Sequence, residues 1–198
     1  MTDYLHAQTK GAPGAPLVVT FHGTGGDEHQ FHDLARQLMP DAHVVSPRGD
    51  VSEHGMARFF RRTGEGVYDM EDLATRREAM AGFVRAKAAE TGAAQVIALG
   101  YSNGANIAAA VALDHPDIFS DVIAMHPLIP WTPAPQPGLA GTRWLITAGE
   151  RDPICPASQT QALMAYLTAQ NVDLSTHWHA GGHELVQSEL TEIQRFLG

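Results

Sequence analysis

The sequence predicts an α/β protein with a mostly parallel central sheet of about seven strands, flanked by helices. Short runs rich in β-branched and apolar residues alternate with helical patterns along the chain. Most of these runs are apolar at every position, as expected for strands covered by helices on both faces. No internal repeat or change of composition divides the chain, so we expect a single domain over residues 1–198.

The strands are expected where β-forming residues cluster between turn signals. In chain order they are Leu17–Phe21, His43–Ser46, Val96–Tyr101, Val122–His126, Trp144–Ala148 and Leu174–Trp178. The last run is more polar than the others, which places it near a sheet edge. Tyr4–Gln8 is expected to form an antiparallel edge strand that leads through a turn at Gly11–Pro16 into the first run.

Four helices are expected between these strands. Met70–Thr91 and Glu184–Leu197 carry apolar residues at spacings of three, four and seven, which is typical of one helix face. Asn103–His115 is rich in alanine and stops before Pro116, because a residue that precedes proline avoids the helical conformation. Ala157–Gln170 follows two prolines.

Two connections are longer than a compact domain needs, and long loops are often functional. They run from Pro47 to about Tyr68 and over Pro127–Gly138, beyond the carboxyl ends of strands, where ligands bind in open α/β sheets. Their large apolar side chains are candidates to line a substrate pocket, or else to cover the core locally: Phe59, Phe60, Leu128 and Trp131. Arg61 and Arg62 either meet an acidic substrate or are simply solvated.

Composition excludes several classes of protein. The formal net charge of −9 argues against a nucleic-acid partner, which requires clustered Lys and Arg. The single cysteine, Cys155, forms no internal disulfide and indicates a reducing compartment. We find no apolar run of about 18 residues and no signal-peptide pattern, so we expect no membrane association and a cytoplasmic location.

A nucleophile motif follows the strand Val96–Tyr101. The segment Gly100-Tyr101-Ser102-Asn103-Gly104 is a G-x-S-x-G pattern between a strand and a helix. The turn is so tight that side chains at the two glycines would collide with neighbouring backbone. The pattern therefore predicts that Ser102 is a nucleophile at the head of a helix, where developing negative charge is favoured. The alternative is a glycine-rich turn with a buried serine.

A serine nucleophile needs a base and an orienting carboxylate, which follow it in the order acid then histidine. Asp152 lies in the loop after Trp144–Ala148 and is preferred to Glu150, although it can also be read as a helix cap. Among eleven histidines, His183 has both the right chain order and a place well into the loop after the last strand. Its alternative role is to cap the last helix.

An oxyanion hole requires two backbone N–H donors. Asn103 supplies one as the residue after the nucleophile, and Thr24 is the candidate for the other, in the loop after Leu17–Phe21. The glycines of this loop, in His22-Gly23-Thr24-Gly25-Gly26-Asp27, let the backbone approach a substrate. A plain turn and a phosphate-binding loop are the alternatives, but the lysine of a Walker motif is absent.

These segments together resemble the α/β-hydrolase fold, and within it the phospholipase/carboxylesterase family. The match extends to Gly149-Glu150-Arg151-Asp152-Pro153 and Gly181-Gly182-His183-Glu184, and Arg58–Asp69 resembles a hydroquinone-associated bacterial subgroup. The resemblance implies a serine carboxylesterase without a large cap domain, acting on small carboxylic esters and often dimeric. One departure is Asn103, where many relatives have glutamine; the backbone donor is unaffected.

Other functions remain as alternatives. The same three residues would serve an acyl thioesterase or lysophospholipase, and a non-catalytic ligand-binding protein on this fold is a different class. His177, His179 and His183 could hold a metal, although that leaves Ser102 unexplained. A dienelactone-type reaction is disfavoured because it usually employs a cysteine, and Cys155 is not at the nucleophile turn. We expect neither a metal nor an organic cofactor.

Overall fold

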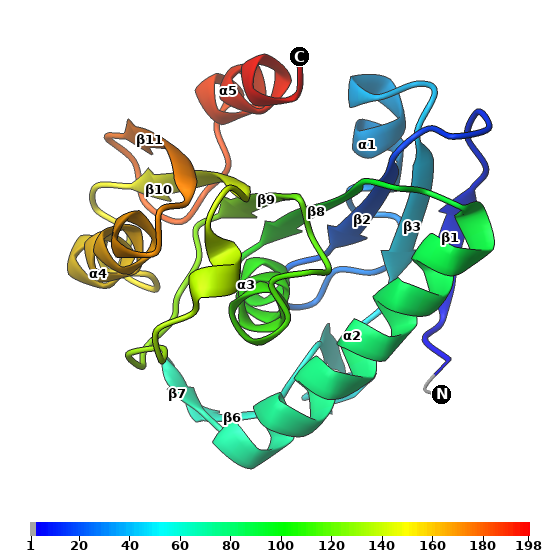
Figure 1. Cartoon of the computed structure of the whole chain (residues 1–198). Helices are drawn as coiled ribbons and strands as arrows, with labels where there is room; N and C mark the ends of the chain where they lie inside the picture. The colour runs from blue at the N-terminus through cyan, green and yellow to red at the C-terminus, as the bar shows by residue number, and fades with distance from the viewer. Residues whose placement is uncertain (1–2) are drawn as a thin grey trace.

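The computed structural model describes residues 3–198, and its centre is a seven-stranded sheet (Figure 1). The strands lie in the order β1-β3-β2-β8-β9-β10-β11, and all are parallel except the edge strand β1, which pairs antiparallel with β3. Their bounds are β1 His6–Thr9, β2 Leu17–Phe21, β3 His43–Pro47, β8 Val96–Tyr101, β9 Asp121–Met125, β10 Arg143–Gly149 and β11 Asp173–His179. The expected fold class is therefore confirmed.

Both edge strands were predicted, but β1 pairs with β3 and does not form a hairpin with β2, the next strand in the chain. β1 aligns Ala7 with Ser46 of β3, because β2 is already flanked by β3 and β8 on its two sides. At the opposite edge lies β11, in which every position is exposed or half-buried, as expected from its more polar sequence.

Five α-helices cover the two faces of the sheet (Figure 1). α1 (His32–Leu38) and α5 (Gln187–Leu197) pack on one face, and α2 (Met70–Thr91), α3 (Asn103–Asp114) and α4 (Ala157–Ala169) pack on the other. α3 is buried along almost its whole length, which explains its alanine-rich sequence: small side chains let it approach β8 and β9 closely. The core consequently forms two apolar layers, one on each side of the sheet.

Two helices depart from expectation. The seven-residue α1 was not predicted, and its sequence is too short for a clear periodic pattern. α5 begins three residues later than expected, at Gln187, because Glu184 turns back to accept a hydrogen bond from the Gly182 N–H. That turn carries His183.

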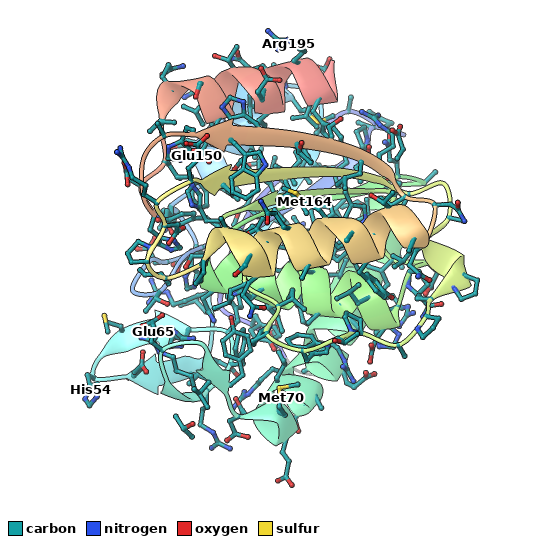
Figure 2. All side chains as sticks on the ribbon, turned by 90° about the vertical axis from the view of Figure 1, so that its left-hand side faces the viewer. His54, Glu65, Met70, Glu150, Met164 and Arg195 are labelled. Atoms are coloured by element: carbon teal, nitrogen blue, oxygen red, sulfur yellow. The ribbon has the colours of Figure 1, made fainter. Side chains whose placement is uncertain are left out.

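The long connection after β3, expected as a loop, contains two β-hairpins. β4 (Val51–Glu53) pairs with β5 (Met56–Arg58), and β6 (Arg62–Gly64) pairs with β7 (Val67–Tyr68). Arg62 joins the hairpins through hydrogen bonds to both oxygens of Glu53, at 2.9 and 3.0 Å. Figure 2 shows the hairpins, labelled at His54 and Glu65, projecting from the body of the sheet. The later loop contains the short 3-10 helix η1 (Pro137–Leu139).

Among residues 3–198, we find no helix with the length and apolar character needed to cross a bilayer.

Candidate active site

Ser102 occupies a strained turn between β8 and α3. Its backbone has a φ of 53°, a conformation that costs free energy for a residue with a side chain and is often kept at functional sites. A Cβ atom built on Gly104 would lie 2.3 Å from the Phe21 carbonyl oxygen, and one built on Gly100 would lie 2.7 Å from the Gly104 carbonyl carbon. Glycine is therefore required at both positions for this turn to form.

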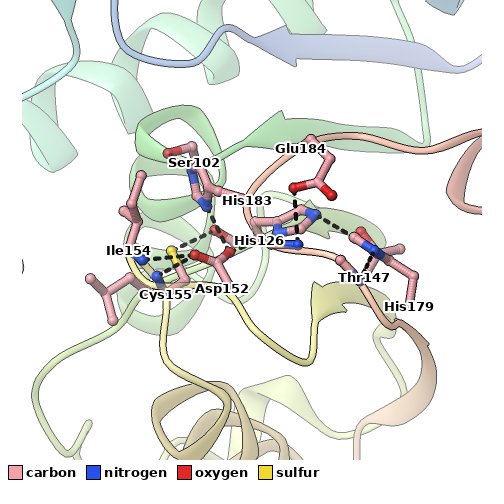
Figure 3. Close-up of polar contacts among 12 residues, drawn as sticks. Ser102, His126, Thr147, Asp152, Ile154, Cys155, His179, His183 and Glu184 are labelled. Carbon is pink, nitrogen blue, oxygen red and sulfur yellow. Dashed lines mark hydrogen bonds and ion pairs between the residues drawn. The ribbon is translucent and has the colours of Figure 1, made fainter.

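The three side chains expected to act together lie in one hydrogen-bonded line (Figure 3). Ser102 Oγ is 2.9 Å from His183 Nε2, and His183 Nδ1 is 2.7 Å from Asp152 Oδ2. In this arrangement Ser102 donates its proton to Nε2, while Nδ1–H donates to the carboxylate. The competing carboxylate, Glu150, is exposed at the end of β10 (Figure 2).

Asp152 is ionised and fixed by its surroundings. Its Oδ1 accepts hydrogen bonds from the backbone N–H groups of Ile154 and Cys155, at 2.8 and 2.9 Å. Burial alone would raise the pKa of this carboxyl, but the hydrogen bonds from Cys155, His126 and His183 more than offset burial, so its pKa lies below the ordinary range. The carboxylate can therefore orient an imidazole at neutral pH.

The candidate oxyanion donors border the cavity in front of Ser102. Among the hydrogen bonds of residues 3–198, the backbone N–H groups of Thr24 and Asn103 reach no protein acceptor, so both can serve a substrate. Arg58 Nη1 holds the Thr24 hydroxyl at 2.7 Å, and the Asn103 side chain accepts a hydrogen bond from the Phe59 N–H at 2.8 Å. The β4–β5 hairpin thus supports both donor positions.

The cavity beside Ser102 has a volume of about 280 Å³. Its walls come from the loop after β2, the hairpins and the loops after β8 to β11: Thr24, Arg58, Arg62, Glu65, Tyr68, Tyr101, Ser102, Asn103, Asn106, Leu128, Ile154, Cys155 and His183. Ionic and apolar groups share these walls, and a bound molecule would meet both. Its position at the carboxyl ends of the strands is the one that the sequence predicted.

Of the four expected pocket residues, only Leu128 belongs to the walls traced from the described residues. Phe59 and Phe60 are fully buried in the core, where Phe59 contacts Phe21 edge-on and Phe60 contacts Tyr68. Trp131 packs beside Tyr68 and borders a separate hollow against α4. The aromatic side chains therefore cover the core locally, as the alternative interpretation allowed.

Sequence reasoning missed two residues that complete this site. His126, the first residue after β9, lies beside Asp152 (Figure 3) and donates to its Oδ2 from Nδ1 at 2.9 Å. The other ring nitrogen, Nε2, contacts Glu189 Oε1 at 3.0 Å. Chain order excluded His126 as a base, but that argument did not test whether it could bind the acid. Glu189 is the third residue of α5, and its periodic pattern gave no sign of an inward carboxylate.

The three histidines considered as metal ligands are not brought together. His177 Nε2 bonds to Ser188 Oγ at 2.9 Å, whereas His183 faces Ser102 and Asp152. His179 instead lies near His126 and Glu189, and the ligand-type atoms of these three lie within 4.8 Å of one another. The structure accounts for their approach by hydrogen bonding, since His126 Nε2 already meets the Glu189 carboxylate at 3.0 Å.

Cys155 is buried rather than poised for reaction. Its thiol donates to the His126 carbonyl oxygen at 3.2 Å, and burial raises the pKa of the thiol far above neutral pH. Its backbone N–H, by contrast, anchors Asp152. The Cys155 side chain is therefore a packed group of the interior.

Comparison with known proteins places this arrangement in a family. The profile of the dienelactone hydrolase family matches residues 3–189. The chain belongs to the dienelactone hydrolase family. The fold is therefore the α/β-hydrolase fold, as the resemblance implied. The doubt about a dienelactone-type reaction concerned its nucleophile, and a serine rather than a cysteine occupies that turn in this member of the family.

Individual relatives match almost the whole chain. The chain is 40% identical over 194 residues to MhqD of Bacillus subtilis (strain 168), whose name describes it as a hydrolase, with 96% of each chain covered. The solved structure of Atu2452 from Agrobacterium tumefaciens, a protein of unknown function, matches with a TM-score of 0.95 at 52% identity, covering 98% of this chain and 95% of that one. A Bacillus cereus carboxylesterase matches with a TM-score of 0.91 at 35% identity, covering 98% and 93%.

Proposed function

We propose that this member of the family is a serine carboxylesterase that hydrolyses small carboxylic esters. One observation carries the proposal: a hydroxyl, an imidazole and an ionised carboxylate form a continuous hydrogen-bonded line that opens into a cavity. The carboxylesterase of Bacillus cereus, 35% identical, supports it as a relative with that named activity. The family name supports ester cleavage as well, because a lactone is a cyclic ester.

In the proposed mechanism, Ser102 Oγ attacks the ester carbonyl carbon while His183 Nε2 takes the hydroxyl proton. The resulting imidazolium is stabilised by Asp152. Negative charge develops on the carbonyl oxygen, and the N–H groups of Thr24 and Asn103 are positioned to bind it.

The tetrahedral intermediate collapses when the bond to the leaving alcohol breaks and His183 donates its proton to that alcohol. Water then attacks the acyl-enzyme and gives up a proton to His183. When the second tetrahedral intermediate collapses, its bond to Ser102 Oγ breaks, His183 returns the proton to that oxygen, and the carboxylic acid is released. Atoms and charge balance without a metal or an organic cofactor.

The proposal is tested by replacing Ser102 with alanine and measuring turnover of p-nitrophenyl acetate. We expect the rate to fall by at least about 10⁴-fold, in line with the loss of a triad member in other hydrolases. Ser158→Ala, at an exposed position of α4, is the matched control and should retain full activity. A loss of less than about tenfold in Ser102→Ala would overturn the role of this serine.

A substrate panel separates esters from the rival substrate class. Matched acetyl esters, acetyl thioesters and an unsaturated lactone share one acyl-transfer mechanism but differ in the leaving group. We expect the highest kcat/KM with the acyclic esters. A higher value for thioesters would reassign the enzyme as a thioesterase, and no turnover together with no labelling by a phosphonate probe would indicate a binding protein.

A further inference from the structure

A second histidine, His126, lies behind the proposed triad and is not itself among the residues that line the cavity. The His126 side chain is fully buried, and its backbone has a φ of 51°, an uncommon conformation for a residue other than glycine. The Thr147 carbonyl oxygen accepts a hydrogen bond from its N–H, and the Cys155 thiol donates to its carbonyl oxygen. The chain thus keeps His126 in a strained conformation that directs its ring beneath His183.

The hydrogen-bond partners of the His126 ring determine its charge. Glu189 Oε1 accepts from the Thr147 hydroxyl at 2.6 Å, and Oε2 accepts from the Val186 N–H at 2.7 Å, so Glu189 is a carboxylate that offers only acceptors to its neighbours. Asp152 is likewise an acceptor on both oxygens. His126 meets one of these carboxylates with each ring nitrogen, and both nitrogens must therefore carry a proton.

His179 does not change this result. Its Nδ1 accepts a hydrogen bond from the Gly181 N–H at 3.1 Å, so the proton of a neutral His179 lies on Nε2. That nitrogen is 3.4 Å from His126 Nε2, a long contact compared with the 3.0 Å between His126 Nε2 and Glu189 Oε1, and 3.6 Å from Glu189 Oε2. Besides His126, the Thr147 hydroxyl and the Val186 N–H both donate to Glu189, and these hydrogen bonds outweigh burial and hold the pKa of this carboxyl below its ordinary range.

We propose that His126 and Glu189 are positioning residues of the active site: a buried imidazolium–carboxylate pair that locks Asp152 in its ionised form and sets the pH at which His183 becomes a competent base. The effect on catalysis rests on the function proposed above. The charge state of His126 does not, because it follows from the contacts alone.

The electrostatic consequence has a definite sign. The His126 and His183 rings lie 5.2 Å apart and share Asp152 Oδ2 as an acceptor. A positive His126 disfavours a second positive charge on His183, so it moves the acid limb of the pH–rate profile to lower pH. The other titratable groups facing His126 are Asp152, Glu189, His179, Tyr101 and Cys155; burial raises the pKa of both Tyr101 and Cys155, which keeps them neutral.

The charge state is tested in the unmodified protein by 15N NMR of the histidine side chains, with His126 assigned through its backbone. We expect both ring nitrogens of His126 to show protonated, imidazolium-type shifts at pH 7. One unprotonated nitrogen at that pH would overturn the proposal. This measurement needs neither a substrate nor a variant.

The effect on catalysis is tested by the pH dependence of kcat/KM in His126→Asn, Glu189→Gln and His177→Asn. Asparagine tolerates a positive φ, and its short amide can still donate to Asp152, so His126→Asn removes mainly the charge. In this variant we expect the acid limb of the pH–rate profile to move to a higher pH by about one unit. A neighbouring charge typically shifts a pKa by about 1–3 units, so this is a small effect of its kind. Glu189→Gln removes an anion and should not raise the limb.

His177→Asn is the matched control because His177 contacts Ser188 instead of this cluster, and its limb should stay at the wild-type pH. A His126→Asn profile that differs from wild type in height alone would show a merely structural role and overturn the proposal. If His126→Asn does not fold, the NMR result on the wild type decides. If the wild type hydrolyses none of the esters, the proposed function is overturned. The charge state of His126 is then still tested by NMR.

Discussion

Asp152 serves two imidazoles with a single oxygen. Its Oδ2 accepts from His183 at 2.7 Å and from His126 at 2.9 Å, while Oδ1 is held by two backbone N–H groups. All of its acceptor positions face donors, and it is 5% exposed. A carboxylate bound in this way cannot rotate without breaking several charge-assisted hydrogen bonds.

Asp152→Asn therefore tests the residue at which both histidines meet. Both oxygens of Asp152 accept hydrogen bonds, so the NH2 group of an asparagine would face donors at one of the two positions. If it faces His183, Nδ1 must accept a hydrogen bond, and the proton of a neutral ring then lies on Nε2, which cannot take the Ser102 proton. We expect kcat for p-nitrophenyl acetate to fall by about 10⁴-fold, as in serine hydrolases with the same change. Glu150→Gln, two residues away and exposed, is the control. Equal losses in the two variants would argue against the assignment of Asp152.

Some site residues could be predicted from the sequence, and others could not. Ser102 was predictable because two glycines and a strand–helix junction encode its turn within five residues. Asp152 and His183 followed from chain order. His126 and Glu189 were not predictable, since their roles depend on contacts 26 and 63 residues apart in sequence, and neither lies in a local motif.

At the scale of elements, the segment that carries His183 depends on a glycine in another strand. A Cβ atom built on Gly149, at the end of β10, would lie 1.9 Å from the Gly182 carbonyl oxygen. The Glu150 N–H also donates to the His179 carbonyl oxygen, and the Arg151 N–H donates to that of Gly181. The loop after β10 therefore positions the loop after β11.

Gly149→Ala should displace that loop and separate His183 from Ser102. We expect ester turnover to fall at least about tenfold, because small misplacements of reacting groups have large kinetic costs. Circular dichroism should report an intact fold. Turnover equal to that of the wild type would mean that the Gly181–Gly182 segment moves without disturbing His183.

A second glycine-to-alanine change, Gly82→Ala within α2, should stabilise the protein. Gly82 is exposed in the middle of the helix, and a Cβ there meets nothing within 4 Å. Alanine is the better helix former, so the free energy of unfolding in urea should rise by about 0.5–1 kcal/mol. Ester turnover should stay at the wild-type value. A decrease in stability would contradict the described position of this glycine.

The elements themselves were largely predictable, and the exceptions share one cause. Buried strands and long periodic helices carry their pattern in the local sequence, as β8 and α2 illustrate with the expected bounds. The two hairpins have strands of only two or three residues and are held by tertiary contacts such as Arg62 with Glu53. Phe59 and Phe60 were placed correctly on a loop, but the sequence did not reveal that this loop turns its rings into the core.

At the scale of the whole molecule, four adjacent parallel strands each deliver one member of the polar cluster. Ser102 follows β8, His126 follows β9, Asp152 lies just beyond β10 and His183 just beyond β11. Parallel strands bring their carboxyl ends to the same edge, so the sheet order alone aligns these residues. The arrangement of the site is thus a direct product of strand order.

The size of the cavity predicts a limit on the acyl group. A volume of about 280 Å³ lies at the lower end of ligand sites, and part of the wall is formed by paired ionic groups. We expect kcat/KM for p-nitrophenyl esters to be highest for acetate and propionate and to fall by at least about tenfold for long acyl chains. Methylenes that do not fit the cavity stay in water and gain nothing from burial. Equal rates for octanoate and acetate would refute this size limit.

The buried ion pairs also predict how global stability varies with pH. Burial lowers the pKa of His126, but its hydrogen bonds with Glu189 and Asp152 outweigh burial and raise it; the pKa values of both carboxyls are lowered. The His126 contribution is complete below its unfolded-state pKa of about 6.5 and is lost as pH rises through the folded-state pKa. The carboxylate contributions are present above about pH 4 and are lost as pH falls.

Urea unfolding between pH 6.5 and pH 9.5 measures the histidine part of this linkage. The free energy of unfolding of the wild type should decrease with pH more steeply than that of His126→Asn, since the variant lacks the group that loses its proton. His177→Asn should follow the wild-type slope. Parallel curves for wild type and His126→Asn would contradict a raised pKa for His126.

The position of Glu189 in the first turn of α5 ties the last helix to the buried cluster around His126. Any shortened or split version of this protein that stops before Gln187 would remove one of the two carboxylates that His126 contacts and leave its ring paired with Asp152 alone. The same dependence offers a design route: a fragment ending at residue 186 could be switched on by supplying α5 as a separate peptide.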